Sequence, residues 1–295
     1  MVAPGPETER RRAIARRVVE HLAAHTDLRA SLLVGSAAVG SSDEHSDIDL
    51  INYYEELPPP AAFAALMRVL AAEPAGDIGK PTAEGFAGRF NLAGVEIQTG
   101  GQLIAATEAR LKRIAAGDVD WITAKVAMGL LEGLPLRGEA LIQDWHARAA
   151  YPEALRRREV EAHLGFFPVW TLDQHLAARD AELFRRQMLL DGAFRVLAVL
   201  SAINRLYFTS FQLKRAGEHV QRMALRPEHL AESLDLIANA PPSEAAEELR
   251  KLVDETKTIV RAELPDVDAD QPWQPPFPAK RGRVGERAEK ERQLE

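Results

Sequence analysis

The feature that most constrains the fold is a pair of short strand-like segments joined by a polar loop. Residues 30–34 (ASLLV) form an apolar run that ends at Gly35-Ser36, and ten residues later the chain reads DIDLIN over residues 47–52. A short apolar run and a run that alternates polar with apolar side chains are both typical of β-strands. Because successive side chains of a strand point to opposite faces, Asp47 and Asp49 are predicted to share one face.

Further strand and helix signals surround these two segments. Residues 7–25 place apolar side chains at helical spacing, with arginines on a face expected to be solvated, and another helix follows Pro58-Pro59-Pro60. Residues 89–92 (RFNL) and 95–98 (VEIQ) flank Ala93-Gly94, which predicts a β-hairpin with a short turn. This part of the chain therefore predicts a small sheet with helices packed against it.

From about Gln102 the pattern is helical almost to the end of the chain. The segment 184–203 predicts a central buried helix, and a proline pair separates two further helices at 226–239 and 243–262. From Pro265 onward, prolines and then mixed charges predict a poorly packed tail. We therefore predict an α+β protein, with a small mixed-sheet domain at 1–116, an all-α helical domain at 117–264 and a flexible tail at 265–295.

Composition excludes several kinds of site. The chain has 295 residues and no cysteine, which excludes disulfides, thiolate metal sites and a cysteine nucleophile. No stretch approaches the ~18 uncharged apolar residues of a membrane span, and the N-terminus has no signal-peptide core, so we expect a cytoplasmic protein. The formal net charge of −7 disfavours nonspecific nucleic-acid binding and suits a cationic small molecule better.

The two aspartates predict a metal site. Two carboxylates on one strand face repel each other when no cation lies between them, and Mg²⁺ prefers carboxylate oxygens as ligands. A third carboxylate from a neighbouring strand would complete a site for two Mg²⁺ ions, and Glu96, between two apolar residues of the predicted hairpin, is the candidate. The alternative for Glu96 is an ordinary solvent-facing strand residue.

The Gly35-Ser36 turn predicts a phosphate-binding site. Glycine lets the backbone approach a ligand closely, and Ser36 begins a short predicted helix. Backbone N–H groups of such a turn, with the Ser36 hydroxyl, would bind phosphate oxygens. A nucleoside triphosphate held there would reach metal ions on Asp47 and Asp49, which suits transfer at the α-phosphate with release of pyrophosphate.

Taken together, Gly35-Ser36, the ten-residue spacer, Asp47-Ile48-Asp49 and Val95-Glu96-Ile97 resemble the signature of the DNA polymerase β-like nucleotidyltransferase superfamily. The layout is similar to that of the small bacterial members with helical C-terminal domains, the aminoglycoside and lincosamide nucleotidyltransferases. This resemblance implies that Asp47, Asp49 and Glu96 bind two Mg²⁺ ions and that the Gly-Ser turn holds the nucleotide phosphates.

The helical half carries a second resemblance and two further candidates. Tyr151-Pro152, Arg179-Asp180 and the run NRLYF at 204–208, followed by Lys214, resemble an uncharacterised branch of the same superfamily, the DUF4037-like proteins. Asp180 is a candidate general base, the role that the aminoglycoside enzymes imply for a helical-domain carboxylate, and its alternative is a salt bridge. Lys214 is a candidate phosphate-binding residue, and its alternative is a surface cation.

These residues predict an enzyme that transfers a nucleoside monophosphate, with AMP from ATP as the expected case, to a hydroxyl of a small molecule such as an aminoglycoside-like antibiotic. Two alternatives stay open. One is nucleotidyl transfer to a protein or a tRNA, as in antitoxin-type nucleotidyltransferases. The other is a module that binds ATP without catalysis. The sequence does not identify the acceptor, because acceptor pockets are assembled from scattered side chains.

Overall fold

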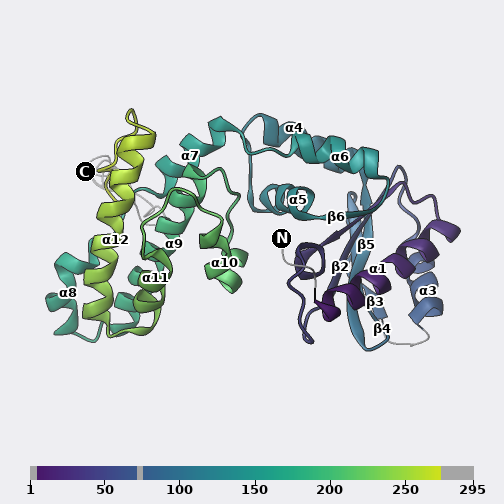
Figure 1. Cartoon of the computed structure of the whole chain (residues 1–295), viewed down its shortest axis with the longest axis horizontal. Helices are drawn as coiled ribbons and strands as arrows, with labels where there is room; N and C mark the ends of the chain where they lie inside the picture. The colour runs from purple at the N-terminus through teal and green to yellow at the C-terminus, as the bar shows by residue number, and fades with distance from the viewer. Residues whose placement is uncertain (1–4, 72–75, 274–295) are drawn as a thin grey trace, which may run out of the picture. The chain divides into compact units, whose positions relative to one another are not determined.

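The computed structural model describes residues 5–71 and 76–273. The chain divides into two compact units, Met1–Leu155 and Arg156–Glu295 (Figure 1). The first unit contains a β-sheet with helices on both of its faces, and the described part of the second unit is helical. The predicted α+β class, a mixed sheet followed by a helical part, is confirmed.

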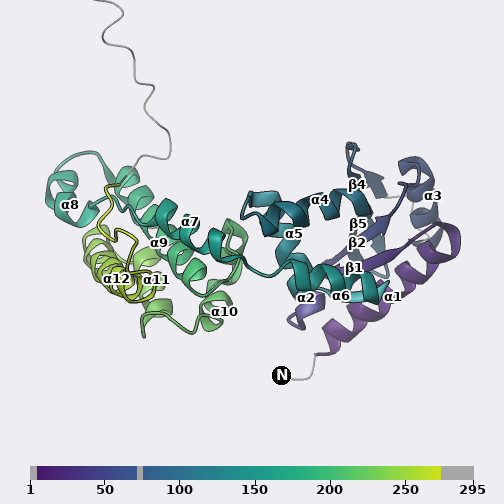
Figure 2. The ribbon, with the colours of Figure 1, turned by 90° about the horizontal axis from the view of Figure 1, so that it is seen from above.

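The sheet of the first unit has six strands in the order β3-β4-β5-β2-β1-β6. Figure 2 shows β4, β5, β2 and β1 side by side, and among the neighbouring pairs only β2 and β5 are parallel. The strands are β1 (Ala30–Val34), β2 (Ile48–Tyr54), β3 (Gly76–Ile78), β4 (Gly85–Leu92), β5 (Val95–Leu103) and β6 (Leu134–Arg137). The two predicted strands and the predicted hairpin are therefore present, with β2 beginning one residue later than expected.

One face of the sheet packs against α1 (Pro6–His25) and α3 (Pro60–Ala71). Ile48 and Leu50 of β2 point to this face, where they are 0% and 3% exposed among the apolar side chains of both helices. Because side chains alternate along a strand, Asp49 points to the opposite face of the sheet.

That opposite face is covered by α4 (Ile104–Ala115), α5 (Trp121–Glu132) and α6 (Glu139–Arg148), which pack against β5 and β1. The indole of Trp145, on α6, is fully buried, and its ring centroid lies 4.8 Å from that of Tyr53 on β2. These three helices are thus part of the first unit, together with the sheet.

The strand β6 corrects the expectation of an unbroken helical pattern after Gln102, because it pairs with β1 at the edge of the sheet. Its four residues, LPLR, are too few to display an alternating pattern, so only the pairing partner reveals the strand. The domain boundary expected near residue 116 lies inside the first unit, which extends to Leu155. A boundary drawn from secondary-structure type separates α5 and α6 from the sheet on which they pack.

The second unit is built around α9 (Glu182–Ile203), which confirms the buried helix expected at 184–203. This helix packs against α8, α11 and α12. The other helices described in the unit are α7 (Glu153–His163, which begins in the first unit), α8 (Val169–Ala177), η1 (Ser210–Arg215), α10 (Ala216–Gln221), α11 (Leu230–Asn239) and α12 (Pro242–Glu263).

The start of the expected tail is packed. Val267 and Ala269 are 6% and 4% exposed within the core of the second unit, and the ring of Trp273 lies 5.1 Å from that of Phe167. The rest of the expected tail, residues 274–295, lies outside the described residues. Among the helices described, none is long and apolar enough to cross a membrane.

Candidate metal and nucleotide site

Asp47 and Asp49 lie at the start of β2, on the sheet face opposite to α1 and α3. Asp47 directly precedes the strand, and Asp49 pairs with Val34 at the end of β1. Both carboxylates are partly exposed, whereas Ile48 between them is buried. The alternation expected from the sequence therefore places the two acids on one face.

Glu96 lies beside the two aspartates because β2 and β5 run parallel. Ile48 pairs with Ile97, and Asp49 pairs with Gln98. Glu96 therefore stands next to the Asp47 position, on the same sheet face. Its side chain is 48% exposed, with Oε1 3.8 Å from Nε of Arg89 on β4.

Gln98 links two of these carboxylates. Its Nε2 atom donates one hydrogen bond to Oδ2 of Asp47, at 2.8 Å, and another to Oε1 of Glu96, at 3.1 Å. Gln98 was not among the candidates from the sequence. The signal that would have found it is its place two residues after Glu96, which puts both side chains on one face of the same strand.

The donor set of this group fits a divalent cation, because three carboxylates share one face at the start of two adjacent parallel strands. Within residues 5–71 and 76–273, no three His, Cys, Asp or Glu side chains already converge closely enough to hold a metal ion. Carboxylates without a cation between them repel one another. Here an amide N–H₂ group, the kind of donor that suits two anions, lies between Asp47 and Glu96.

The Gly35-Ser36 turn is the start of the short helix α2 (Gly35–Val39), as the sequence predicts. Gly35 has φ +70°, and a Cβ atom added to it would lie 2.7 Å from Oδ2 of Asp49. The backbone of the turn is therefore in contact with the carboxylate group. The Ser36 hydroxyl lies 3.2 Å from that of Ser42, in the loop that leads to Asp47.

Two arginines of α1 hold this turn and loop. Arg11 is 1% exposed, and it donates hydrogen bonds to the carbonyl oxygens of Ser46 (2.7 Å) and Glu44 (3.1 Å) and to the carboxylate of Glu7. Arg12 donates to the carbonyl oxygens at the end of α2, those of Ala37 and Ala38, at 2.9 and 2.8 Å.

These contacts correct the expectation that the arginine face of the first helix is simply solvated. Arg11 fixes the residue directly before Asp47, and Arg12 fixes the helix that follows Gly35. Amphipathic spacing does not distinguish a solvated arginine from one that reaches a distant loop. The sequence pattern therefore did not predict that these two arginines hold the turn and the loop.

The helix α5 borders the same corner of the sheet. A Cβ atom at Gly133 would touch Leu32, and one at Gly129 would lie 3.5 Å from Cγ1 of Val34, so α5 runs antiparallel to β1. The preceding turn of α5 carries Lys125, and α5 also packs against α2. The ammonium of Lys125 lies 5.2 Å from the centroid of the half-exposed Trp121 ring.

Asp120 fixes the start of α5 beside this corner. Its Oδ1 accepts a hydrogen bond of 2.8 Å from the backbone N–H of Thr123. Hydrogen bonds from Thr123, followed in importance by Arg113, lower the pKa of Asp120 to about 2. The carboxylate therefore stays ionised at neutral pH and serves as an N-cap.

Asp180 and Lys214, the candidates from the helical half, both belong to the second unit. Asp180 is exposed in the turn between α8 and α9. Lys214 is exposed on η1, with its ammonium 5.2 Å from the ring centroid of Phe211. Their roles toward the carboxylates of the first unit stay predictions.

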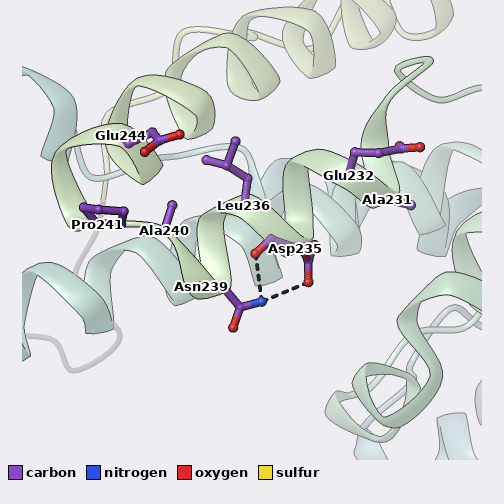
Figure 3. Close-up of a pocket in the computed structure, with 8 residues that line it drawn as sticks. All are labelled: Ala231, Glu232, Asp235, Leu236, Asn239, Ala240, Pro241 and Glu244. Atoms are coloured by element: carbon purple, nitrogen blue, oxygen red, sulfur yellow. Dashed lines mark hydrogen bonds between the residues drawn. The ribbon is translucent and has the colours of Figure 1, made fainter.

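The second unit also has an open hollow between α11 and α12, which contains neither of these candidates (Figure 3). Its charged lining groups are the carboxylates of Glu232, Asp235 and Glu244, and Asn239 donates a hydrogen bond of 2.9 Å to Oδ1 of Asp235. Without a cationic side chain among its lining residues, this hollow does not suit a phosphate group.

Comparison with known proteins gives a distant structural likeness. No family model and no curated protein matches the chain. Among solved structures the chain is similar to a nucleotidyltransferase-like protein from Exiguobacterium sibiricum, with 13% sequence identity and a TM-score of 0.33. That match covers 90% of this chain and 82% of the other.

Proposed function

We propose that this protein is a Mg²⁺-dependent nucleotidyltransferase that transfers a nucleoside monophosphate, AMP from ATP, to a hydroxyl of a small molecule. The observation that carries the proposal is the grouping of Asp47, Asp49 and Glu96 on one sheet face, with Asp49 in contact with the Gly35 turn. An isolated Asp-x-Asp strand does not require a glycine turn against its second aspartate. A glycine there lets the backbone N–H groups of the turn approach a phosphate beside the candidate metal ligands.

Each group has a distinct task in this proposal. Asp47, Asp49 and Glu96 would hold two Mg²⁺ ions, and the Gly35-Ser36 turn would bind the triphosphate. Bound there, the metal would activate the acceptor hydroxyl and offset the charge of the departing pyrophosphate. Arg11 and Arg12 keep the turn and the aspartate loop in place through their bonds to backbone carbonyls.

For the acceptor side, the proposal uses the two candidates that the sequence predicts in the second unit. Asp180 would act as the general base that takes the proton of the acceptor hydroxyl, and Lys214 would contact the phosphates. The net charge of −7 favours a cationic acceptor, with aminoglycoside-like antibiotics as the first compounds to test.

The test is release of pyrophosphate from labelled ATP in the presence of Mg²⁺ and a panel of hydroxyl-bearing acceptors. We expect turnover with at least one acceptor, and we expect Asp49→Asn to reduce it by roughly a thousandfold or more, because the site loses a ligand charge. Asp77→Asn, on the edge strand β3, is the matched control and should leave turnover unchanged. Full turnover in Asp49→Asn would exclude the metal assignment.

Two further measurements separate the alternatives. Transfer of label to a protein band or to RNA in a lysate, with no small-molecule product, would replace the proposed acceptor class. Thermal stabilisation by Mg-ATP without release of pyrophosphate under any condition would instead indicate a nucleotide-binding module.

A further inference from the structure

The carboxamide of Gln98 has the same two partners that a metal ion would have in the proposed site. One nitrogen atom, Nε2, donates to Asp47 at 2.8 Å and to Glu96 at 3.1 Å. An N–H₂ group carries two hydrogens, so a single amide satisfies both carboxylates. The reverse orientation would turn the amide oxygen toward two anions, so electrostatics selects the orientation in which nitrogen faces them.

The neighbours of Gln98 place its amide among the carboxylates of the proposed metal site. Gln98 pairs with Asp49 in the parallel ladder, so its side chain stands among all three carboxylates. Without a metal ion, the hydrogen bonds from its N–H₂ group, together with the Arg89 guanidinium 3.8 Å from Oε1 of Glu96, offset part of the repulsion between Asp47 and Glu96. A divalent cation bound by those two carboxylates would compete with the amide for their lone pairs and would repel its hydrogens.

We propose that Gln98 is a positioning residue that holds Asp47 and Glu96 together only while the metal is absent. Its amide releases both carboxylates when a divalent cation binds. This inference rests on the proposed function only in assuming that the three carboxylates bind a divalent cation. It assigns Gln98 a role opposite to that of a ligand, because its bonds compete with the metal.

Thermodynamic linkage gives this role a distinctive signature. Bonds that exist only in the metal-free state stabilise that state and so weaken metal binding. Removing these bonds should therefore strengthen metal binding. A metal ligand, or a residue that orients the ligands in the bound state, has the opposite effect, because its loss weakens metal binding by roughly 10- to 100-fold.

The experiment is a Mn²⁺ titration of the full-length protein, followed by electron paramagnetic resonance without nucleotide, on the wild type, Gln98→Met and Gln98→Thr. Met keeps the length of Gln without a donor. Thr suits a strand and is too short to bridge the carboxylates. Gln102→Met is the matched control, since Gln102 lies on the same strand and the same face and donates to the backbone oxygen of Glu84 at 3.0 Å.

We expect both Gln98 variants to bind Mn²⁺ roughly three- to tenfold more tightly than the wild type, in line with the loss of two charge-assisted bonds. Gln102→Met should match the wild type. The melting temperature of the Gln98 variants should fall in EDTA and approach that of the wild type in saturating Mn²⁺, a pattern that a purely structural defect would not produce.

Weaker Mn²⁺ binding in the Gln98 variants, or unchanged binding, would overturn the proposal while leaving the metal site intact. A failure of the proposed function would be seen in the wild type and in Asp49→Asn instead. If the wild type binds no Mn²⁺, or if Asp49→Asn binds it as well as the wild type does, the carboxylate assignment itself fails.

Discussion

Gly35 and Asp49 are in contact across the end of the β1–β2 pair: a Cβ atom at Gly35 would lie 2.7 Å from Oδ2 of Asp49. Gly35 also has φ +70°, a backbone conformation that side chains other than glycine rarely adopt. Two independent constraints therefore require glycine at the turn. One is local to the backbone, and the other comes from the candidate metal ligand.

Substitution of this glycine separates the two constraints. We expect Gly35→Ala to lose at least about 1 kcal/mol more unfolding free energy than Gly94→Ala, because it adds a close contact to the cost of a positive φ. Gly94 has φ +76° with nothing within 4 Å of an added Cβ, so it reports the backbone cost alone. Urea denaturation measures both. Equal losses would mean that Asp49 moves aside freely.

Arg11 is predicted to support both the fold and the site. Arg11→Met should reduce the free energy of unfolding by about 2–4 kcal/mol, because the carbonyl oxygens of Ser46 and Glu44 lose their charged, buried donor. Mn²⁺ binding should weaken as the loop before Asp47 loosens. The exposed Arg17, on the same helix, is the control, and Arg17→Met should change stability by less than about 0.5 kcal/mol.

Lys125 is predicted to bind nucleotide, because its turn of α5 lies at the Gly35 end of β1. We expect Lys125→Met to raise the dissociation constant of Mg-ATP about tenfold, the usual effect of losing one charge-assisted contact to phosphate. Isothermal titration calorimetry measures this constant directly.

Lys80 provides the control for Lys125. It lies in the loop before β4, which begins opposite Gln102, at the other end of β5 from Glu96. Lys80→Met should bind Mg-ATP as the wild type does. An equal loss in both variants would indicate a general effect of net charge and not a contact.

The second unit should lose stability in mild acid because of His219. Burial, and to a smaller extent Arg222, lower the pKa of His219 from 6.5 to about 4. The imidazole is 5% exposed and lies 2.8 Å from the Ser201 hydroxyl. Above pH 6.5 it is neutral in both states, so its contribution to stability is fully present there.

Between pH 6.5 and 4 the unfolded chain takes up a proton that the folded protein does not, so unfolding becomes easier as the pH falls. The loss should approach about 3 kcal/mol near pH 4. Urea denaturation across this range should show the slope in the wild type and a flatter curve in His219→Gln. His25→Gln, at an exposed position of α1, should retain the slope.

Local patterns predicted the elements that carry the candidate site. Alternation placed Asp47 and Asp49 on one face, and the buried Ile48 and Leu50 agree with it. The Ala93-Gly94 turn has φ +56° and +76°, the two positive values of a type I′ hairpin turn. These features depend on residues close together in the chain, which is why sequence spacing was enough to predict them.

Other parts of the site depended on partners far away in the chain. Gln98 reaches Asp47 across 51 positions, and Arg11 reaches Ser46 across 35. The strand β6 exists because β1 offers it an unpaired edge, and α5 borders the site because it packs along β1. The spacing of residues in the sequence does not predict such contacts, since Gln and Arg also occur commonly on solvated surfaces.

The amino-acid pattern therefore decided the carboxylate pair, the glycine turn and the hairpin, because strand alternation and backbone conformation are properties of neighbouring residues. The tertiary structure decided that Glu96 stands beside Asp47, that Gln98 bridges them and that Arg11 anchors their loop. Strand order and helix packing set those relationships, and they arise only when burial of the apolar faces brings distant segments together.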